Sequence, residues 1–235
     1  MTSGGTVAAI VPAAGRGERL GPGTPKALRP LGGLPMLSHA VRGLAEARLV
    51  DLVVVAAPPG GVADVKALLT GYEGGADVLV VEGGTTRQES VRSALASLPP
   101  DVSVVLVHDA ARPLAPVELV DAVVAAVQRG ADAVVPVVPV ADTVKRIGED
   151  GEVAETLDRS ALRAVQTPQG FRRDVLARAH ETAASDATDD AGLVERLGIA
   201  VVTVPGSEEA FKVTRPLDLV LAEAVLSRRR AVRGC

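Results

Sequence analysis

The size and charge of this chain of 235 residues exclude several classes of protein. A net charge of −4 argues against a nucleic-acid-binding protein, and the single cysteine excludes an intrachain disulfide. The N-terminus lacks the basic segment of a secretion signal, and its apolar run is too short to cross a bilayer. We therefore expect a cytoplasmic protein that binds neither nucleic acid nor membranes.

Short apolar runs alternate with helical patterns along the chain. The continuous β-branched runs predict strands that are buried on both faces, as in a parallel sheet covered by helices. These runs are Val7–Pro12, Leu52–Pro58, Asp77–Gly84, Ser103–Pro113, Asp132–Val140 and Ile199–Gly206. Apolar stripes at helical spacing predict helices within 35–50, 85–98, 115–130, 174–184, 189–198 and 215–230. The alternation predicts a single α/β domain over residues 1–235, with a doubly wound, mostly parallel sheet.

One polar segment, Asp142–Arg159, interrupts this alternation. It contains two short β-prone runs, "VKRI" and "VAETL", on either side of the turn sequence "GEDGE". This arrangement is typical of a β-hairpin. Because the segment has no apolar core to join, we expect it to be a lid or an arm that reaches a partner.

The loop at residues 13–25 directly follows the first predicted strand. Ligands of open α/β sheets bind beyond the carboxyl ends of the strands, so this loop is either an anion-binding loop or a surface turn. The sequence does not match the dinucleotide fingerprint, because Leu20 stands where a third glycine is required. It does not match the P-loop either, because Pro22 follows Gly21. The remaining anion-binding possibility is a triphosphate loop of another design.

Eight motifs in this chain resemble, in the same order, those of the 2-C-methyl-D-erythritol 4-phosphate cytidylyltransferases. They are "VPAAGRGERLGPGTPKAL", "GGTTRQESV", "VHDAARP", "PVADTVKR", "TLDR", "QTPQGF", "ATDDA" and "FKVTRPLDL". The resemblance implies a Rossmann-like nucleotidyltransferase fold. It also implies a reaction of CTP with methylerythritol 4-phosphate that gives CDP-methylerythritol and pyrophosphate, with Mg²⁺ bound mainly through the CTP phosphates.

The resemblance assigns the catalytic charges on the CTP side to Arg19 and Lys26, which would stabilise the transition state. Contacts to CTP are implied for Ala13, Ala14, Gly15, Gly84, Thr85, Ser90, Asp109 and Ala110. Relatives often carry an acidic residue where this chain has Thr85. For Ser90 the alternative is a structural role in the first turn of a helix. A carboxylate such as Asp109 can also bind a sugar hydroxyl or help to hold Mg²⁺.

On the acceptor side, Arg159 and Lys212 would orient the phosphate of methylerythritol phosphate. The resemblance adds Arg112, Thr143, Thr167 and Thr188 to this side. It also implies a homodimer in which the arm at 142–159 embraces a second subunit and completes the neighbour's site. For Arg112 the alternative is an ion pair with Asp109 that braces the turn.

Other functions remain open at this point. Cytidylyltransferases for another polyol phosphate, such as ribitol 5-phosphate, resemble this chain closely. A non-catalytic nucleotide-binding regulator would share the fold, whereas the failed fingerprint disfavours a nicotinamide dehydrogenase.

The attacking phosphate is already an anion, so the reaction requires no general base, and we interpret His108 as a packed structural residue. The run "SRRRAVRG" is interpreted as a solvated basic tail.

Overall fold

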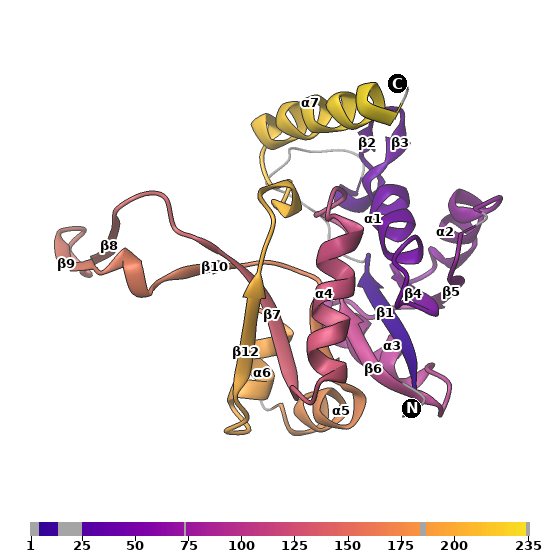
Figure 1. Ribbon diagram of the computed structural model, residues 1–235, viewed down its shortest axis with the longest axis horizontal. Helices are drawn as coiled ribbons and strands as arrows, with labels where there is room; N and C mark the ends of the chain where they lie inside the picture. The colour runs from indigo at the N-terminus through magenta and orange to yellow at the C-terminus, as the bar shows by residue number, and fades with distance from the viewer. Residues whose placement is uncertain (1–4, 14–24, 73, 184–186, 234–235) are drawn as a thin grey trace.

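In the computed structural model, which describes residues 5–13, 25–72, 74–183 and 187–233, eight strands form one central sheet (Figure 1). Its path is β10-β7-β11-β6-β1-β4-β5, and β12 pairs with β7. The bounds are β1 (Thr6–Pro12), β4 (Leu52–Ala57), β5 (Asp77–Glu82), β6 (Val102–Val107), β7 (Ala133–Pro139), β10 (Arg163–Val165), β11 (Gln169–Arg172) and β12 (Val201–Pro205).

The sheet is mostly parallel, as predicted. Strand β1 lies parallel to β4 and β6, β4 lies parallel to β5, and β12 lies parallel to β7. The short strands β10 and β11, which were not predicted, run antiparallel to their neighbours. The six predicted strands are confirmed, and the structure ends the one predicted at Ser103–Pro113 already at Val107.

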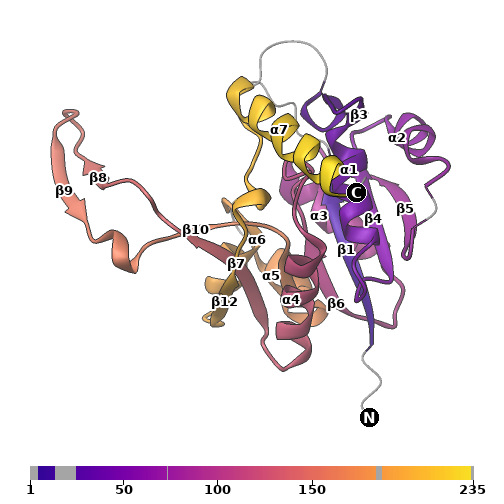
Figure 2. The same cartoon turned by 45° about the horizontal axis from the view of Figure 1, so that its top comes forward.

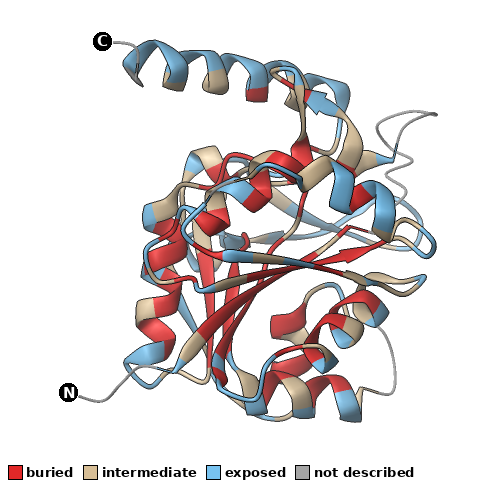
Figure 3. Ribbon diagram, turned by 90° about the vertical axis from the view of Figure 1, so that its right-hand side faces the viewer, coloured by how far each residue is buried: buried red, intermediate tan, exposed pale blue. Residues whose placement is uncertain are grey.

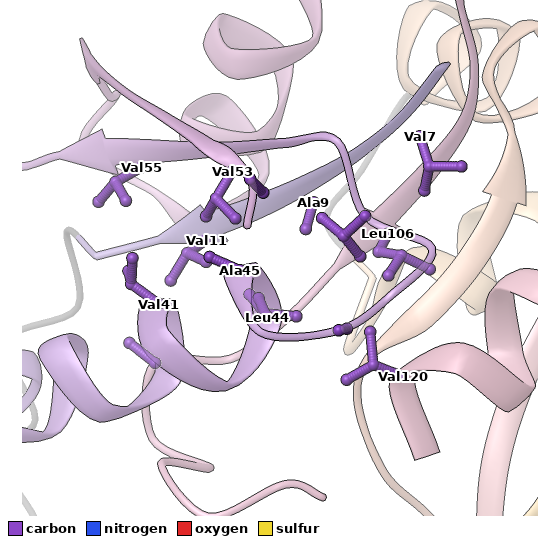
Figure 4. Close-up of a cluster of buried hydrophobic side chains, with 14 of the residues drawn as sticks. Val7, Ala9, Val11, Val41, Leu44, Ala45, Val53, Val55, Leu106 and Val120 are labelled. Carbon is purple, nitrogen blue, oxygen red and sulfur yellow. The ribbon is translucent and has the colours of Figure 1, made fainter. Parts of the chain in front are cut away.

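Helices cover both faces of the sheet because successive strand residues point to opposite sides. Val7, Ala9 and Val11 face α1 (Met36–Ala45), α2 (Val62–Leu69) and α4 (Val117–Gln128). Figure 4 shows this cluster. Ala8 and Ile10 face α3 (Arg87–Ala96), α5 (Arg173–Thr182) and α6 (Asp190–Glu195). Figure 3 shows the buried residues concentrated on the sheet and on the helix faces that meet it.

Helix α7 (Pro216–Arg233) lies outside these layers and packs on a small hairpin of β2 (Pro30–Leu31) and β3 (Leu34–Pro35). The basic run lies at the end of this helix, where Arg228 and Arg230 are exposed, as predicted for a solvated segment, and Arg229 is half-buried. Arg228 and Arg229 both pair with Glu209, and Arg230 donates a hydrogen bond to the carbonyl of Gly32. None of the helices in the described ranges is long and apolar enough to span a membrane.

The predicted hairpin is present as β8 (Val144–Ile147) and β9 (Val153–Leu157), which pair antiparallel. Figures 1 and 2 show that it extends far from the sheet on the chain between β7 and β10. Ile147 and Val153 at its tip are 54% and 58% exposed. The hairpin forms a sheet separate from the central one, so we refer to residues 142–159 as the arm.

Candidate active site

The carboxyl ends of β6, β1, β4 and β5 lie side by side at one edge of the sheet. The N–H of Ala13, just after β1, donates to the carbonyl of Ala56 on β4 at 2.9 Å. The N–H of Gly83, just after β5, donates to the carbonyl of Ala57 at 2.8 Å. These bonds continue the sheet beyond the strands and bring the segments that follow β1 and β5 together, where parallel α/β sheets bind ligands.

The first of these segments leads from Ala13 to Lys26. Ala13 is buried, and Lys26 is the first residue of the short helical turn η2 (Lys26–Leu28), which packs against α1. The predicted residues Ala14, Gly15 and Arg19 lie outside the described part of the chain.

The loop after β5 is fixed by a capping box at the start of α3. The Thr86 hydroxyl accepts from the N–H of Glu89, and the Glu89 carboxylate accepts from the N–H of Thr86 at 3.1 Å. The same carboxylate accepts from the hydroxyl of Thr85 at 2.6 Å and from its N–H at 2.8 Å. The hydrogen bonds from Thr85 and Thr86 lower the pKa of Glu89, so the loop is held by a carboxylate at neutral pH.

Ser90, on the α3 helix that follows this loop, also holds the loop in place. Its buried hydroxyl accepts from the N–H of Gly84 at 3.2 Å and donates to the carbonyl of Thr86 at 2.9 Å. A Cβ atom on Gly84 would lie 2.2 Å from the Cβ of Glu89, so only glycine fits this turn. The hydroxyl of Ser90 is therefore engaged inside the loop, in the structural role that the sequence left open.

Asp109, two residues beyond β6, is the electrostatic centre of the described site. Its Oδ1 accepts from Nε of Arg87 at 3.3 Å, and its Oδ2 lies 2.7 Å from Nζ of Lys212. Burial alone would raise the pKa of Asp109, but the charges of Arg87 and Lys212 outweigh burial and hold this pKa well below its usual range. The carboxylate is thus ionised and shared between two cations.

The guanidinium of Arg112 does not form the ion pair with Asp109 that was the alternative to an acceptor contact. It donates instead to the carbonyl of Ala210 at 2.7 Å and to that of Val165 at 3.2 Å. These bonds tie the loop after β6 to β10 and to the segment that carries Lys212. Ala110 lies buried in the same loop.

Thr167 reaches this edge because β11 runs antiparallel to β6 and therefore starts where β6 ends. Its hydroxyl accepts from the N–H of Asp109 at 3.0 Å and lies 3.1 Å from Nδ1 of His108. Nε2 of His108 lies 3.2 Å from the carbonyl of Arg112, which can only accept, so Nε2 carries the proton. Burial lowers the pKa of His108 to about 4, so the ring is neutral and Nδ1 accepts from Thr167.

We expect His108→Asn to reduce kcat by less than the ~10²-fold that removal of a general acid or base costs. His108 is buried, and its polar partners belong to the protein. A loss of more than about 10³-fold with an intact fold would instead assign His108 an acid–base role.

The same variant should change the pH dependence of stability. Between pH 6.5 and about 4 the unfolded chain protonates this histidine while the folded protein does not, so stability falls as pH falls through this window. Across this window the free energy of unfolding should fall by on the order of 3 kcal/mol. Urea unfolding across this pH range should show a shallower slope for His108→Asn than for the wild type.

The remaining predicted residues lie at different places. Thr188 is exposed and directly precedes Asp189, the N-cap of α6. Thr143 and Arg159 are exposed on the arm, where the guanidinium of Arg159 donates to the carbonyl of Ala141. Figures 1 and 2 show the arm extending away from the ends of β1 and β6. The structure therefore brings Lys212 and Thr167 to Asp109, and it leaves Thr143 and Arg159 on the arm.

Arg87 is the site residue that sequence reasoning missed. Besides Asp109 it contacts Asp190, with Nη1 2.7 Å from Oδ2. The only signal in the sequence was that both residues fall within quoted motifs, "GGTTRQESV" and "ATDDA".

Comparisons with known proteins agree with this geometry. A family model described as 2-C-methyl-D-erythritol 4-phosphate cytidylyltransferase matches residues 7–228. The enzyme of that name from Streptomyces coelicolor is 63% identical over 235 residues, covering 97% of this chain and 87% of the relative. The one from Saccharopolyspora erythraea is 56% identical over 225 residues, covering 94% of this chain and 100% of the relative.

Solved structures give the same result. The 4-diphosphocytidyl-2C-methyl-D-erythritol synthase from Anaerococcus prevotii matches with a TM-score of 0.82 at 28% identity, covering 95% of this chain and 99% of that chain. The 2-C-methyl-D-erythritol 4-phosphate cytidylyltransferase from Thermus thermophilus matches with a TM-score of 0.73 at 40% identity, covering 92% and 97%. The chain therefore belongs to the 2-C-methyl-D-erythritol 4-phosphate cytidylyltransferase family, the nucleotidyltransferases that transfer the cytidylyl group of CTP to methylerythritol phosphate in isoprenoid synthesis.

Proposed function

We propose that CTP and methylerythritol 4-phosphate bind side by side at the strand ends, and that the residues named above divide into a CTP side and an acceptor side. The observation that carries this assignment is the shared carboxylate of Asp109. We refer to the loop after β5, residues 83–86, as the base-side loop. Through Arg87, the first residue of α3, this carboxylate connects the base-side loop to Lys212, a cation near the other end of the chain.

On the CTP side, the loop from Ala13 to Lys26 would hold the triphosphate, with the charge of Lys26 close to the α-phosphate. Arg19 joins it in this assignment, although it lies outside the described residues. The cytosine would be read by backbone groups of Gly84 and Thr85. The loop that carries these groups is fixed in advance by Ser90 and Glu89, so little ordering remains when CTP binds.

The chemistry is a displacement at the α-phosphorus of CTP. A phosphate oxygen of methylerythritol 4-phosphate forms the new P–O bond, the bond from the α-phosphorus to its bridging oxygen breaks, and pyrophosphate leaves. The nucleophile is an anion at neutral pH, so the protein must supply alignment and positive charge rather than a base. The neutral, buried His108 fits this requirement.

On the acceptor side, Lys212 would bind the phosphate of methylerythritol 4-phosphate. Its side chain is 41% exposed, so the ammonium group can turn from Asp109 towards a ligand. Thr188 presents an exposed side chain just before α6. Thr167 and Arg112 are engaged within the protein and would act by holding the loop of Asp109.

Mg²⁺ would reach this site mainly through the CTP phosphates. The described residues contain no cluster of three or more histidine, cysteine or acidic side chains that could hold a metal. Two carboxylates of the site are already engaged, Asp109 by two cations and Glu89 by N–H groups. Binding through the nucleotide is compatible with Mg²⁺, which commonly binds through substrate phosphates and water. Bound there, the ion would neutralise charge on the triphosphate.

The arm would complete the acceptor side of a second subunit. A lone two-stranded hairpin is marginal in water, and the tip of this one exposes Ile147 and Val153. Two-fold dimers are the commonest homo-oligomers, and in such a dimer each arm can reach the other subunit. We therefore assign Thr143 and Arg159 to the partner's site, within a cytoplasmic homodimer of single-domain subunits.

Pyrophosphate release tests the assignment of substrates. We expect rapid release with CTP and methylerythritol 4-phosphate, and much slower release when UTP replaces CTP, because the base-side loop presents fixed hydrogen-bonding groups. Ribitol 5-phosphate serves as the matched alternative acceptor. Equal turnover with UTP would contradict base recognition by this loop, and faster turnover with ribitol 5-phosphate would contradict the assignment of the acceptor.

A further inference from the structure

Arg87 bridges two carboxylates at the junction of three segments of the site. It is the first residue of α3, directly after the base-side loop. Its Nε donates to Asp109 after β6, and its Nη1 lies 2.7 Å from Asp190 at the start of α6. One guanidinium thus connects the segments that carry Thr85, Asp109 and Thr188.

Asp190 is a buried, hydrogen-bonded anchor for Arg87. It is 1% exposed, and its Oδ1 accepts from Nε2 of His180 on α5 at 2.9 Å. Burial alone would raise the pKa of Asp190, but the hydrogen bond from His180 and the charge of Arg87 lower it, so the carboxylate is ionised. Gln169 on β11 fixes the same helix end, because its amide binds Asp189 at 2.7 Å and the N–H of Ala191 at 3.1 Å.

The two cations on Asp109 are held differently. The guanidinium of Arg87 lies between two carboxylates and is 33% exposed, whereas Lys212 reaches Asp109 with the single ammonium group of a long side chain that is 41% exposed. An acceptor phosphate would draw Lys212 away from Asp109. The remaining carboxylate is only 12% exposed, and an unpaired charge in such a position is costly. Arg87 stays in place and removes that cost.

We propose that Arg87 is a positioning residue that fixes and neutralises Asp109, so that Lys212 can turn from Asp109 to the phosphate of the acceptor. Asp190 and His180 hold Arg87 in place for this role. The inference rests on the role proposed above for Lys212, and it adds that Arg87 acts on the acceptor through Lys212.

A double-mutant cycle in kcat/KM for methylerythritol 4-phosphate tests this coupling. We expect Arg87→Gln to lower this value by about 10- to 100-fold in the wild type, and far less in a Lys212→Met background, because the residue through which it acts is already absent. Asp190→Asn keeps the charge of Arg87 but weakens its anchor, so its effect should be smaller and should also disappear in the Lys212→Met background.

Arg173→Gln is the matched control. Arg173 is likewise the first residue of its helix, α5, and its guanidinium donates to the carbonyls of Pro99 and Leu98. We expect this change to lower Tm and to leave kcat/KM unchanged, in both backgrounds. If Arg87→Gln does not fold, the Asp190→Asn cycle gives the same test.

The outcomes separate the two proposals. If Lys212→Met itself leaves kcat/KM for the acceptor unchanged, the role of Lys212 is wrong. If Lys212→Met is impaired and the effects of the Arg87 and Asp190 variants multiply with it, the role of Lys212 stands and the coupling through Arg87 is overturned.

Discussion

Replacement of Lys26 by alanine is expected to lower kcat by about 10²- to 10³-fold, the usual effect of removing one charge or donor that stabilises a transition state. Lys26 begins the helical turn η2 at the end of the loop that would hold the triphosphate. Negative charge is most concentrated there when the α-phosphorus is attacked, so the loss should appear in kcat more than in KM for CTP.

Steady-state kinetics with CTP and methylerythritol 4-phosphate as varied substrates provide the measurement. Lys66→Ala is the matched control, because Lys66 is an exposed lysine on α2, outside the proposed site. It should leave both constants unchanged. A Lys26→Ala enzyme with normal kcat and a raised KM for CTP would show that Lys26 only binds the nucleotide.

Replacement of Arg159 by alanine should lower kcat/KM for methylerythritol 4-phosphate by about 10²- to 10³-fold. Arginine can bind a phosphate monoester through two parallel hydrogen bonds. Alanine would leave the negative charge of the acceptor phosphate without this partner. KM for CTP should change much less, because Arg159 is assigned to the acceptor.

The matched control lies in the same arm. Arg146 on β8 pairs with Glu155 on β9, and both side chains are exposed. Exposed pairs of this kind contribute about 0–1 kcal/mol, so Arg146→Ala should leave the kinetics unchanged. Wild-type kinetics of Arg159→Ala would show that Arg159 has no part in acceptor binding.

The central strands could be predicted because their sequences carry the signal of burial on both faces. β1 and β4, for example, consist almost entirely of Val, Ile, Leu and Ala. β10 and β11 could not be predicted, because each has only three or four residues and each contains an arginine. Helix α2 was not predicted either, although Val62, Val65, Leu68 and Leu69 recur at helical spacing and pack against the core.

Part of the candidate site could be predicted because its position follows from the parallel strands. Segments that directly follow parallel strands, such as those of Ala13, Gly84 and Asp109, must meet at one edge of the sheet. Contacts between segments far apart in the sequence were not predictable. Arg87 and Asp190 meet only because α3 and α6 pack on the same face of the sheet.

The sharing of each site between two subunits is tested most directly by mixing two inactive variants. Lys26→Ala subunits and Arg159→Ala subunits are combined and allowed to exchange, and pyrophosphate release is measured. In the proposed dimer, each site combines Lys26 of one subunit with Arg159 of the other. One site of a mixed dimer would therefore contain both substitutions, and the other site would contain neither. Random pairing makes about half of the dimers mixed, so activity should recover to about a quarter of the wild-type value. No recovery, with exchange confirmed independently, would show that Lys26 and Arg159 serve a site within one chain.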